Sequence, residues 1–340
     1  MAGDALTNDP FGYQEITDAI NKMPFQDDGL ADIIPGTVTD CLTDRVQVDT
    51  ETGFVQVLPI TGRGGDPAAN KRNTRATVDL KLPIYEVTDT LHERELLVPS
   101  RETGSIAMRT AQTYRDTIVQ PMGQSLALTR AWQRCKGWLD GKIPDSDGST
   151  WMDVFARLGE TQIEMEWDTT DAKFKLGHAV TETKEEIEDE LGGLRANRYV
   201  IVSGRNANRR LRKTKEAEAA STDAGRFFLQ QKDSRSGIPI QDDVDIVGYG
   251  RMRHRLPNGQ VVGFVDDDYA YMVPIAPGLA RVINGPSDMK QFRGQILENY
   301  ASTRELGHGK GEELLLQGCF LHFFARPRSV IKIRVLGDDE

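Results

Sequence analysis

Residues 101–139 carry the feature that most constrains the fold, a helical pattern of about 39 residues. Apolar or small side chains recur there at spacings of three and four, which is typical of one helix face. They are Ala111, Tyr114, Ile118, Met122, Leu126, Thr129, Trp132 and Cys135. Pro121 lies inside this pattern, and we expect a bend there because proline removes one backbone hydrogen bond. Helices usually have about 10–14 residues. The sequence therefore predicts an extended scaffold in place of a compact globule.

A glycine-rich basic stretch, ITGRGGDPAANKRNTR at residues 60–75, lies between two strand-like segments. Before it, Arg45–Val48 and Phe54–Ile60 alternate like the strands of a hairpin joined by DTETG. After it, residues 76–82 place apolar and polar side chains in strict alternation, as in a half-buried strand. The basic stretch is therefore predicted to be a loop tip between two extended arms.

The composition of this tip favours a protein partner over a nucleotide. A phosphate-binding loop needs Gly-Lys-Ser/Thr followed by a helix, and a dinucleotide fold needs G-x-G-x-x-G; both are missing here. The flexible, basic residues of the tip are Arg63, Gly64, Gly65, Lys71, Arg72 and Arg75. Because the whole chain has a net charge of -10, we expect this tip to contact carboxylates of an acidic protein.

The second half has the alternating pattern of an α/β region. An acidic helix is expected at residues 183–194, a buried strand at 198–204 and a basic helix at 205–220, followed by short strands and two apolar C-terminal strands broken at Pro327. The basic helix carries Arg209, Arg210, Arg212, Lys213 and Lys215. We expect these cations to form a solvated face or to pair with Glu185, Glu186 and Glu188.

Residues that could carry catalysis are scarce. The five histidines are dispersed and show no metal-ligand spacing. We interpret Asp266–Asp268 as a solvated turn more readily than as a cation site. Cys319 lies in an apolar strand and is interpreted as a buried and inert thiol. The sequence predicts no enzyme, no cofactor and no metal. Three widely spaced cysteines indicate reduced thiols, no apolar run is long enough for a membrane span, and the acidic charge disfavours tight nucleic-acid binding.

The order of these parts resembles that of a known family. The parts are the RGGDPAANKR tip, KLPIYEVTDTL, a long helix ending in WLDGKI, VIVSGRNANRRLRKTKEAEAA, FVDDDYAYMVP and a terminal RPRSVIKIRV. In this order and spacing, from about residue 30 to 335, the chain resembles the lambda-type major capsid proteins of tailed phages, the capsid protein E family. The resemblance implies an α+β subunit of the Hong Kong 97-type capsid fold.

The resemblance also implies a division of the chain. It implies an N-terminal arm at 1–45, an extended hairpin loop at 46–100, a peripheral domain at 101–180 with a spine helix at 101–139, an axial domain at 181–280, and a return to the peripheral domain with C-terminal strands at 281–340. The peripheral sheet would be completed by 150–180 and the C-terminal strands. An exposed hairpin and an over-long helix cannot bury their apolar faces within one chain, so neighbouring copies are expected to cover them.

The implied function is the icosahedral head shell of a tailed phage, present in the virion and assembled in the host cytoplasm. The implied partners are other copies in hexamers and pentamers, a separate scaffolding protein, a portal, a decoration or cement protein, and packaged double-stranded DNA bound without sequence specificity. Some relatives cross-link a loop lysine to a neighbour, and Lys71 occupies such a place, but lambda-type subunits use decoration proteins instead. Two alternatives stay open: a cargo-holding nanocompartment shell of the same fold, and a nucleotide-dependent enzyme built on the glycine-rich loop.

Overall fold

The computed structural model describes residues 17, 21, 29–52, 74–92, 111–171, 173–192, 196–215, 217, 238–250, 253–256 and 259–337. The chain divides into two units, each built from three separate segments. Unit 1 contains residues 1–44, 82–137 and 280–323, and unit 2 contains residues 45–81, 138–279 and 324–340. Among the described residues, no helix is long and apolar enough to cross a membrane.

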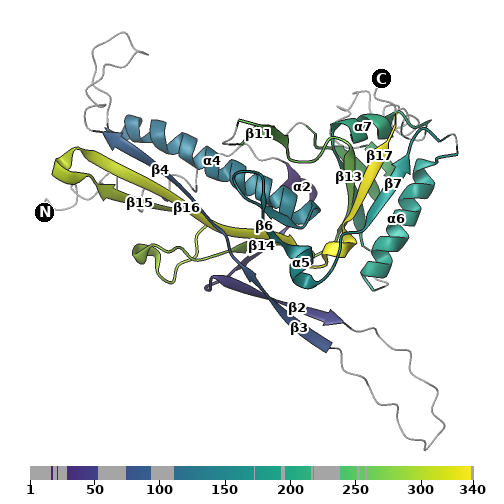
Figure 1. Ribbon diagram of the computed structural model, residues 1–340, viewed down its shortest axis with the longest axis horizontal. Coiled ribbons are helices and arrows are strands. Elements are labelled where there is room, and N and C mark those ends of the chain that lie inside the picture. The colour runs from purple at the N-terminus through teal and green to yellow at the C-terminus, as the bar shows by residue number, and fades with distance from the viewer. Residues whose placement is uncertain are drawn as a thin grey trace, which may run out of the picture. The chain divides into compact units, whose positions relative to one another are not determined.

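Unit 1 is a five-stranded sheet packed against a long helix (Figure 1). The strands are β1 (Thr37–Asp40), β14 (Ala280–Asn284), β16 (Gly311–Phe324) and β15 (Tyr300–Glu305) in that order, with β4 (Ile84–His92) also paired with β16. Short helical turns complete the unit: α2 (Leu30–Ile33), η1 (Lys290–Phe292) and η2 (Gly307–Gly309). Val119 and Met122 of the long helix pack against Leu314 and Leu316 of β16, so the apolar face predicted from the sequence does cover the sheet.

The long helix, α4, spans Ala111–Leu139. The predicted helix is confirmed over this range, while its expected first turns at 101–110 lie outside the described residues. α4 continues through Pro121, whose ring is exposed to solvent, and the Ser125 hydroxyl donates to the Pro121 carbonyl at 2.9 Å. The loss of one backbone donor therefore does not end the helix. The bend at Pro121 stays a prediction.

Unit 2 contains a six-stranded mixed sheet with two helices on one face (Figure 1). The strand order is β7 (Glu164–Asp168), β17 (Ile331–Leu336), β13 (Tyr269–Ile275), β8 (Arg198–Ser203), β10 (Val244–Gly248) and β9 (Ile238–Gln241). Helices α6 (Leu176–Glu190) and α7 (Arg205–Arg212) share one apolar core with this sheet. The buried strand, the acidic helix and the basic helix that the sequence predicts are all present, although α7 is shorter than expected.

Smaller elements surround this sheet. They are the paired strands β5 (Lys142–Pro144) and β6 (Thr150–Asp153), the paired strands β11 (Arg253–Arg255) and β12 (Val261–Gly263), the helix α5 (Val154–Leu158) and the turn η3 (Pro327–Ser329). The break predicted at Pro327 is confirmed, because η3 separates β16 from β17.

The predicted hairpin between Arg45–Val48 and Phe54–Ile60 is wrong in its pairing. β2 (Arg45–Thr52) continues through the supposed turn and pairs antiparallel with β3 (Thr74–Lys81), with Arg45 opposite Lys81 and Thr52 opposite Thr74. Residues 54–60 lie outside the described residues. Alternation identifies a strand but not its partner, and β-branched threonines within DTETG suit a strand as well as a turn.

The prediction of which strands complete the sheet beside the spine helix also needs correction. β16 does lie in the sheet of unit 1, but β7 and β17 pair with each other, in parallel, inside the sheet of unit 2. The cause is the turn η3, after which the chain pairs with β13 instead of extending β16. The names peripheral and axial, and the boundaries attached to them, stay predictions.

Candidate functional site

The base of the β2–β3 hairpin is a two-faced ribbon. Val48 and Leu80 are buried, with Leu80 fully inaccessible, and β3 lies against α5. On the opposite face Gln47, Asp79 and Lys81 are exposed. Since successive side chains of a strand point to opposite sides, this pattern fixes the register and holds the ribbon by one face against the rest of unit 2.

All but one of the predicted contact residues belong to the connection between these two strands. Arg63, Gly64, Gly65, Lys71 and Arg72 lie outside the described residues. Arg75 lies in β3 at the position opposite Glu51. Because Thr52 and Thr74 pair, the connection starts and returns at neighbouring points, as expected for a loop tip between two extended arms. What the tip contacts stays a prediction.

The basic helix α7 is fixed to the sheet by a buried arginine. Arg210 donates to the Val335 carbonyl at 2.6 Å and forms an ion pair with Asp268 at 3.0 Å. The expected solvated face is found for Arg209, Lys213 and Lys215, which are exposed, whereas Arg210 forms its ion pair with Asp268. Its neighbour Arg209 is exposed, so α7 has one charge turned inward and others turned outward.

Asp266–Asp268 is the turn predicted from the sequence, with Asp266 and Asp268 exposed, and its groups also make defined contacts. The Asp267 carbonyl accepts from the backbone N–H groups of Asn206 and Ala207 at 2.9 Å, which satisfies the start of α7. The Asp267 carboxylate accepts from Arg253 at 2.7 Å. These acids therefore serve a helix start and arginine side chains. In the part of the chain that the structure describes, no three His, Cys, Asp or Glu side chains form a group that could hold a metal ion.

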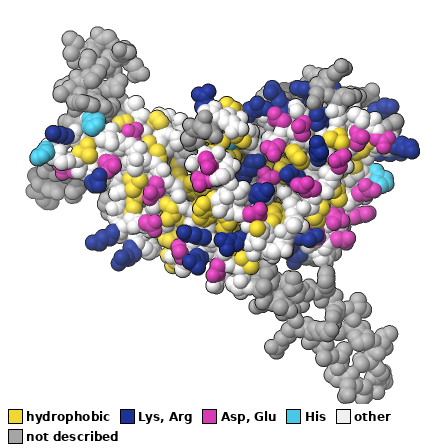
Figure 2. Space-filling model, in the orientation of Figure 1, with side chains coloured by type: hydrophobic (Ala, Val, Ile, Leu, Met, Phe, Trp, Pro, Cys, Tyr) yellow, Lys and Arg dark blue, Asp and Glu magenta, His cyan; other side chains and the backbone are white. Residues whose placement is uncertain are grey.

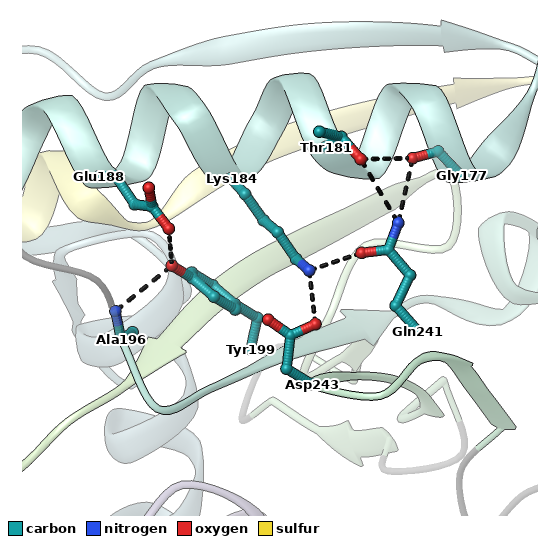
Figure 3. A network of polar contacts seen from close by, with 8 residues as sticks. All are labelled: Gly177, Thr181, Lys184, Glu188, Ala196, Tyr199, Gln241 and Asp243. Carbon is teal, nitrogen blue, oxygen red and sulfur yellow. Dashed lines mark hydrogen bonds and ion pairs between the residues drawn. The ribbon is translucent and has the colours of Figure 1, made fainter.

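One flank of α6 is tied to the sheet by a polar network (Figure 3). Lys184 Nζ donates to Asp243 Oδ1 and to Gln241 Oε1, each at 2.5 Å, and lies 5.4 Å from the centre of the Tyr199 ring. Tyr199 donates its hydroxyl to Glu188 at 2.9 Å. The Lys184 side chain is only 11% exposed. This network fixes the rotation of α6 about its axis and so decides which of its charges face solvent.

Unit 1 has a comparable anchor at Arg130 of α4. Arg130 Nη2 donates to the Glu298 carbonyl at 2.6 Å, Nη1 lies 3.2 Å from the Glu298 carboxylate, and the guanidinium stacks 4.2 Å from the centre of the Phe320 ring. Burial lowers the pKa of Arg130 to about 10, and the Glu298 charge partly opposes this effect. The arginine stays charged at neutral pH and holds the segment before β15 against the helix.

Two further buried groups of unit 1 lie on β16. His322 shares a short hydrogen bond with Gln133 of α4, and Gln133 donates to the Phe320 carbonyl at 3.2 Å. Burial, and then the charges of Arg134 and Arg130, hold the pKa of His322 well below its usual value, so the imidazole is neutral. Burial also raises the pKa of Cys319 to about 12, which agrees with the predicted inert thiol.

Sequence reasoning missed Arg130, Gln133, Lys184 and His322. For the residues on helices, their place in the helical pattern could have indicated that they are buried. Arg130, for example, follows Leu126 by four residues and so lies on the predicted apolar face of α4. The partners of all four are far away in the chain, as with Arg130 and Glu298. Local spacing could not identify these partners.

The long helix on a sheet, the base of the β2–β3 hairpin and the second unit with its helix-covered sheet are the parts of the fold that can be compared with solved structures. Three solved structures are similar: the capsid of cyanophage P-SCSP1u (11% identity, 89% of this chain and 87% of that chain, TM-score 0.52), Gordonia phage Cozz (10%, 93% and 89%, 0.54) and the capsid of an empty GTA particle (8%, 93% and 92%, 0.54). At these identities the likeness shows the fold, which is of the Hong Kong 97 type.

The sequence then identifies the family. Residues 12–335 match the family described as phage major capsid protein E, which is nearly the whole chain. The chain belongs to this family, whose members form the head shell of phages. No protein with a curated description matches it in sequence.

Proposed function

We propose that the chain is the repeating subunit of a tailed-phage head, in which hexamers and pentamers form an icosahedral shell around double-stranded DNA. The family match over residues 12–335 is the observation that carries this proposal. It favours a head shell over a cargo-holding nanocompartment and over an enzyme, and the subunit is expected to have no catalytic turnover. The shell belongs to the virion and is assembled in the host cytoplasm.

The contact between subunits is assigned to the hairpin loop. The β2–β3 base is held by one face against its own unit, which supports a loop that reaches outward from a fixed support. Arg63, Lys71, Arg72 and Arg75 would pair with carboxylates of a neighbouring copy, while Gly64 and Gly65 let the tip change its angle as the shell expands. Each exposed pair contributes only about 0.2–1 kcal/mol, but the contact repeats at every subunit boundary.

The remaining partners follow from the same role. A separate scaffolding protein, a portal and a decoration protein would complete the head. The net charge of -10 supports weak, sequence-independent contact with the packaged DNA, because a shell that bound phosphates tightly would hinder packaging and release.

The loop assignment is tested by replacing Arg63, Lys71, Arg72 and Arg75 with serine. The control replaces four exposed lysines by serine, and so changes the net charge equally: Lys173, Lys175, Lys290 and Lys310. We expect a normally folded monomer whose shells fail to form or crack on heating, whereas the control forms stable shells. Tip-variant shells that withstand heat and high salt like those of the unmodified chain would refute the assignment.

A further inference from the structure

The strand β1, at one end of the strand order in unit 1, is covered on neither face. All four of its residues, Thr37–Asp40, are exposed, and Val38 is 62% accessible to solvent. Leu42, which follows the strand, is 66% exposed. A strand of a folded sheet usually buries the side chains of at least one face. β1 is therefore attached to the sheet through its backbone ladder, and its apolar side chain is left to solvent.

The outer edge of β1 directs backbone groups away from the sheet. β1 runs parallel to β14, and among the described residues no other strand pairs with it. The Cys41 N–H, just after the strand, donates to the Asn284 carbonyl at 2.9 Å. Because the backbone groups of successive residues point to opposite edges, Thr39 also faces β14, whereas Val38 and Asp40 direct their N–H and C=O groups outward. These groups are suited to bind a further strand.

The residues of β1 do not protect this edge, although other edge strands of the chain are protected. Charged side chains, proline and bulges hinder the pairing of an edge with another strand. In unit 2, β7 exposes Glu164 and Glu166, and β9 contains Pro239; in unit 1, β4 exposes Glu86. Figure 2 shows charged side chains spread over the surface in view. β1 has only one charge, Asp40, and neither a proline nor a bulge in its ladder.

A second copy of this chain is the partner that fits such an edge. The proposed hairpin contact joins two different patches, so it is head-to-tail and closes copies into rings. Rings that are joined into an icosahedral shell also meet across two-fold axes, where each copy offers the same patch. Two identical edge strands satisfy this condition, because a two-fold axis between them makes the pair antiparallel.

Side chains determine the register of such a pair. The outward groups belong to Val38 and Asp40, so these residues form the hydrogen-bonded positions. Placing Asp40 opposite Asp40 of the second copy would bring two carboxylates together, which destabilises a pair. Placing Val38 opposite Val38 would leave Asp40 opposite Gly36, outside the strand. Placing Val38 opposite Asp40 uses all four residues of each strand and sets Thr39 opposite Thr39, a favourable cross-strand pair.

We infer that β1 pairs antiparallel with β1 of a second copy across a two-fold axis, with Thr39 at the centre. The inference rests on the proposed function and deepens it, by naming a contact that joins neighbouring rings. Four residues from each copy bury far less than the roughly 1,200 Å² of a stable isolated complex. The contact therefore forms in the assembled shell, where it repeats at every such axis, and not as a dimer of dispersed subunits.

A cysteine at the centre of the pair tests the register. Facing side chains at a position that is not hydrogen-bonded have Cβ atoms about 4.5–5.5 Å apart, close to the 3.5–4.5 Å or so of a disulfide. Thr39→Cys is made with Cys41→Ser, which removes the half-exposed native thiol. The matched control is Thr88→Cys with Cys41→Ser, because Thr88 is also an exposed threonine of an edge strand in unit 1.

Shells of both variants are oxidised and their subunits are separated by denaturing electrophoresis without reductant. We expect covalent dimers from Thr39→Cys shells in at least about tenfold higher yield than from the control. Shells of Thr39→Cys that release no covalent dimer would overturn the inference while leaving the proposed function intact. Equal dimer yields from the two variants would overturn it as well, because the bond would then not depend on the paired strands.

Val38→Pro tests the hydrogen bonds of the contact. Proline removes the outward N–H of residue 38 and leaves Thr39 able to pair with β14. We expect rings to form, but the yield of closed shells in electron microscopy to fall at least about tenfold, since every two-fold contact loses hydrogen bonds. Val38→Thr keeps the N–H and should assemble like the unmodified chain.

Circular dichroism on each monomer verifies folding. Closed shells of Val38→Pro at the unmodified yield would overturn the inference. If Val38→Pro fails to fold or loses its rings too, the dimer yield of Thr39→Cys decides. An unmodified chain that stays monomeric throughout would overturn both this inference and the proposed function.

Discussion

Replacing Lys184 by methionine should destabilise unit 2 without changing its fold. Methionine keeps the chain of heavy atoms as far as the ε position but removes the ammonium group, which leaves Asp243 and Gln241 without the donor that each contacts at 2.5 Å. The Lys184 and Asp243 side chains are only 11% and 21% exposed, so water replaces these contacts poorly.

The magnitude follows from the two contacts. A hydrogen bond to a charged group contributes about 1.5–3 kcal/mol, and the partial exposure of Asp243 reduces the total, so we expect a loss of about 2–3 kcal/mol in the free energy of unfolding. Asp243→Asn keeps the shape and weakens one contact, with an expected loss of about 1–2 kcal/mol. The double variant should lose less than the sum, because the two residues share one interaction.

Urea unfolding of the dispersed monomer, followed by tryptophan fluorescence, measures these free energies. Glu185→Gln on the exposed side of the same helix is the control and should change the free energy of unfolding by less than about 0.5 kcal/mol. A Lys184→Met protein within about 0.5 kcal/mol of the unmodified chain, or strictly additive losses in the double variant, would show that the network does not hold α6.

Three further predictions concern unit 1. Because the pKa of His322 is lower in the folded protein than in the unfolded chain, stability is lost as pH falls below about 6.5, by about 1.4 kcal/mol per pH unit. His322→Asn should flatten this decline in urea titrations, and an unchanged slope would contradict the buried neutral imidazole. Gly311→Ala should lower the free energy of unfolding by about 2–4 kcal/mol in thermal unfolding, because Gly311 has φ +145° and a Cβ there would lie 2.0 Å from the Leu91 carbonyl oxygen. The control Gly294→Ala, at φ +80° with open space around it, should lower it by about 1 kcal/mol. In the native protein at pH 8, iodoacetamide should modify the half-exposed Cys41 and leave Cys319 untouched, as mass spectrometry of the peptides would show; equal modification would contradict its burial.

The parts of the fold that were predictable from the sequence are those governed by short-range patterns. The spacing of Met122, Leu126 and Cys135 identified α4, and the alternation of Val78 and Leu80 with polar residues identified β3, because burial on one side imposes these periods. The break at Pro327 was equally local. Such features depend on neighbouring residues alone.

The parts that escaped prediction depend on partners distant in the chain. Nothing near residue 45 shows that β2 pairs with β3 across the connection at 53–73, and nothing near β17 shows that it joins β7 and β13. Strand pairing is decided by the whole core, which a single segment does not reveal. The anchors at Arg130 and Lys184 escaped for the same reason, since arginine and lysine are by default assigned to the surface.

The candidate contact residues show the same division. Arg63 to Arg75 were selected by composition and by their place between two strands, and the pairing of Thr52 with Thr74 supports that place. Which charges of α7 face the core became visible only in the structure. Arg210 and Arg209 are adjacent in the sequence and equal in charge, yet one is buried against Asp268 and the other faces solvent.

Electron microscopy of the purified chain, alone and with the scaffolding protein that we propose for it, tests the central claim most directly. The account predicts closed icosahedral shells, or sheets and rings of their hexamers and pentamers, and a reconstruction in which each subunit has the long helix α4 and the β2–β3 hairpin laid over a neighbour. Particles absent under every condition, with a single stable monomer in sedimentation even when the scaffolding protein is present, would contradict it.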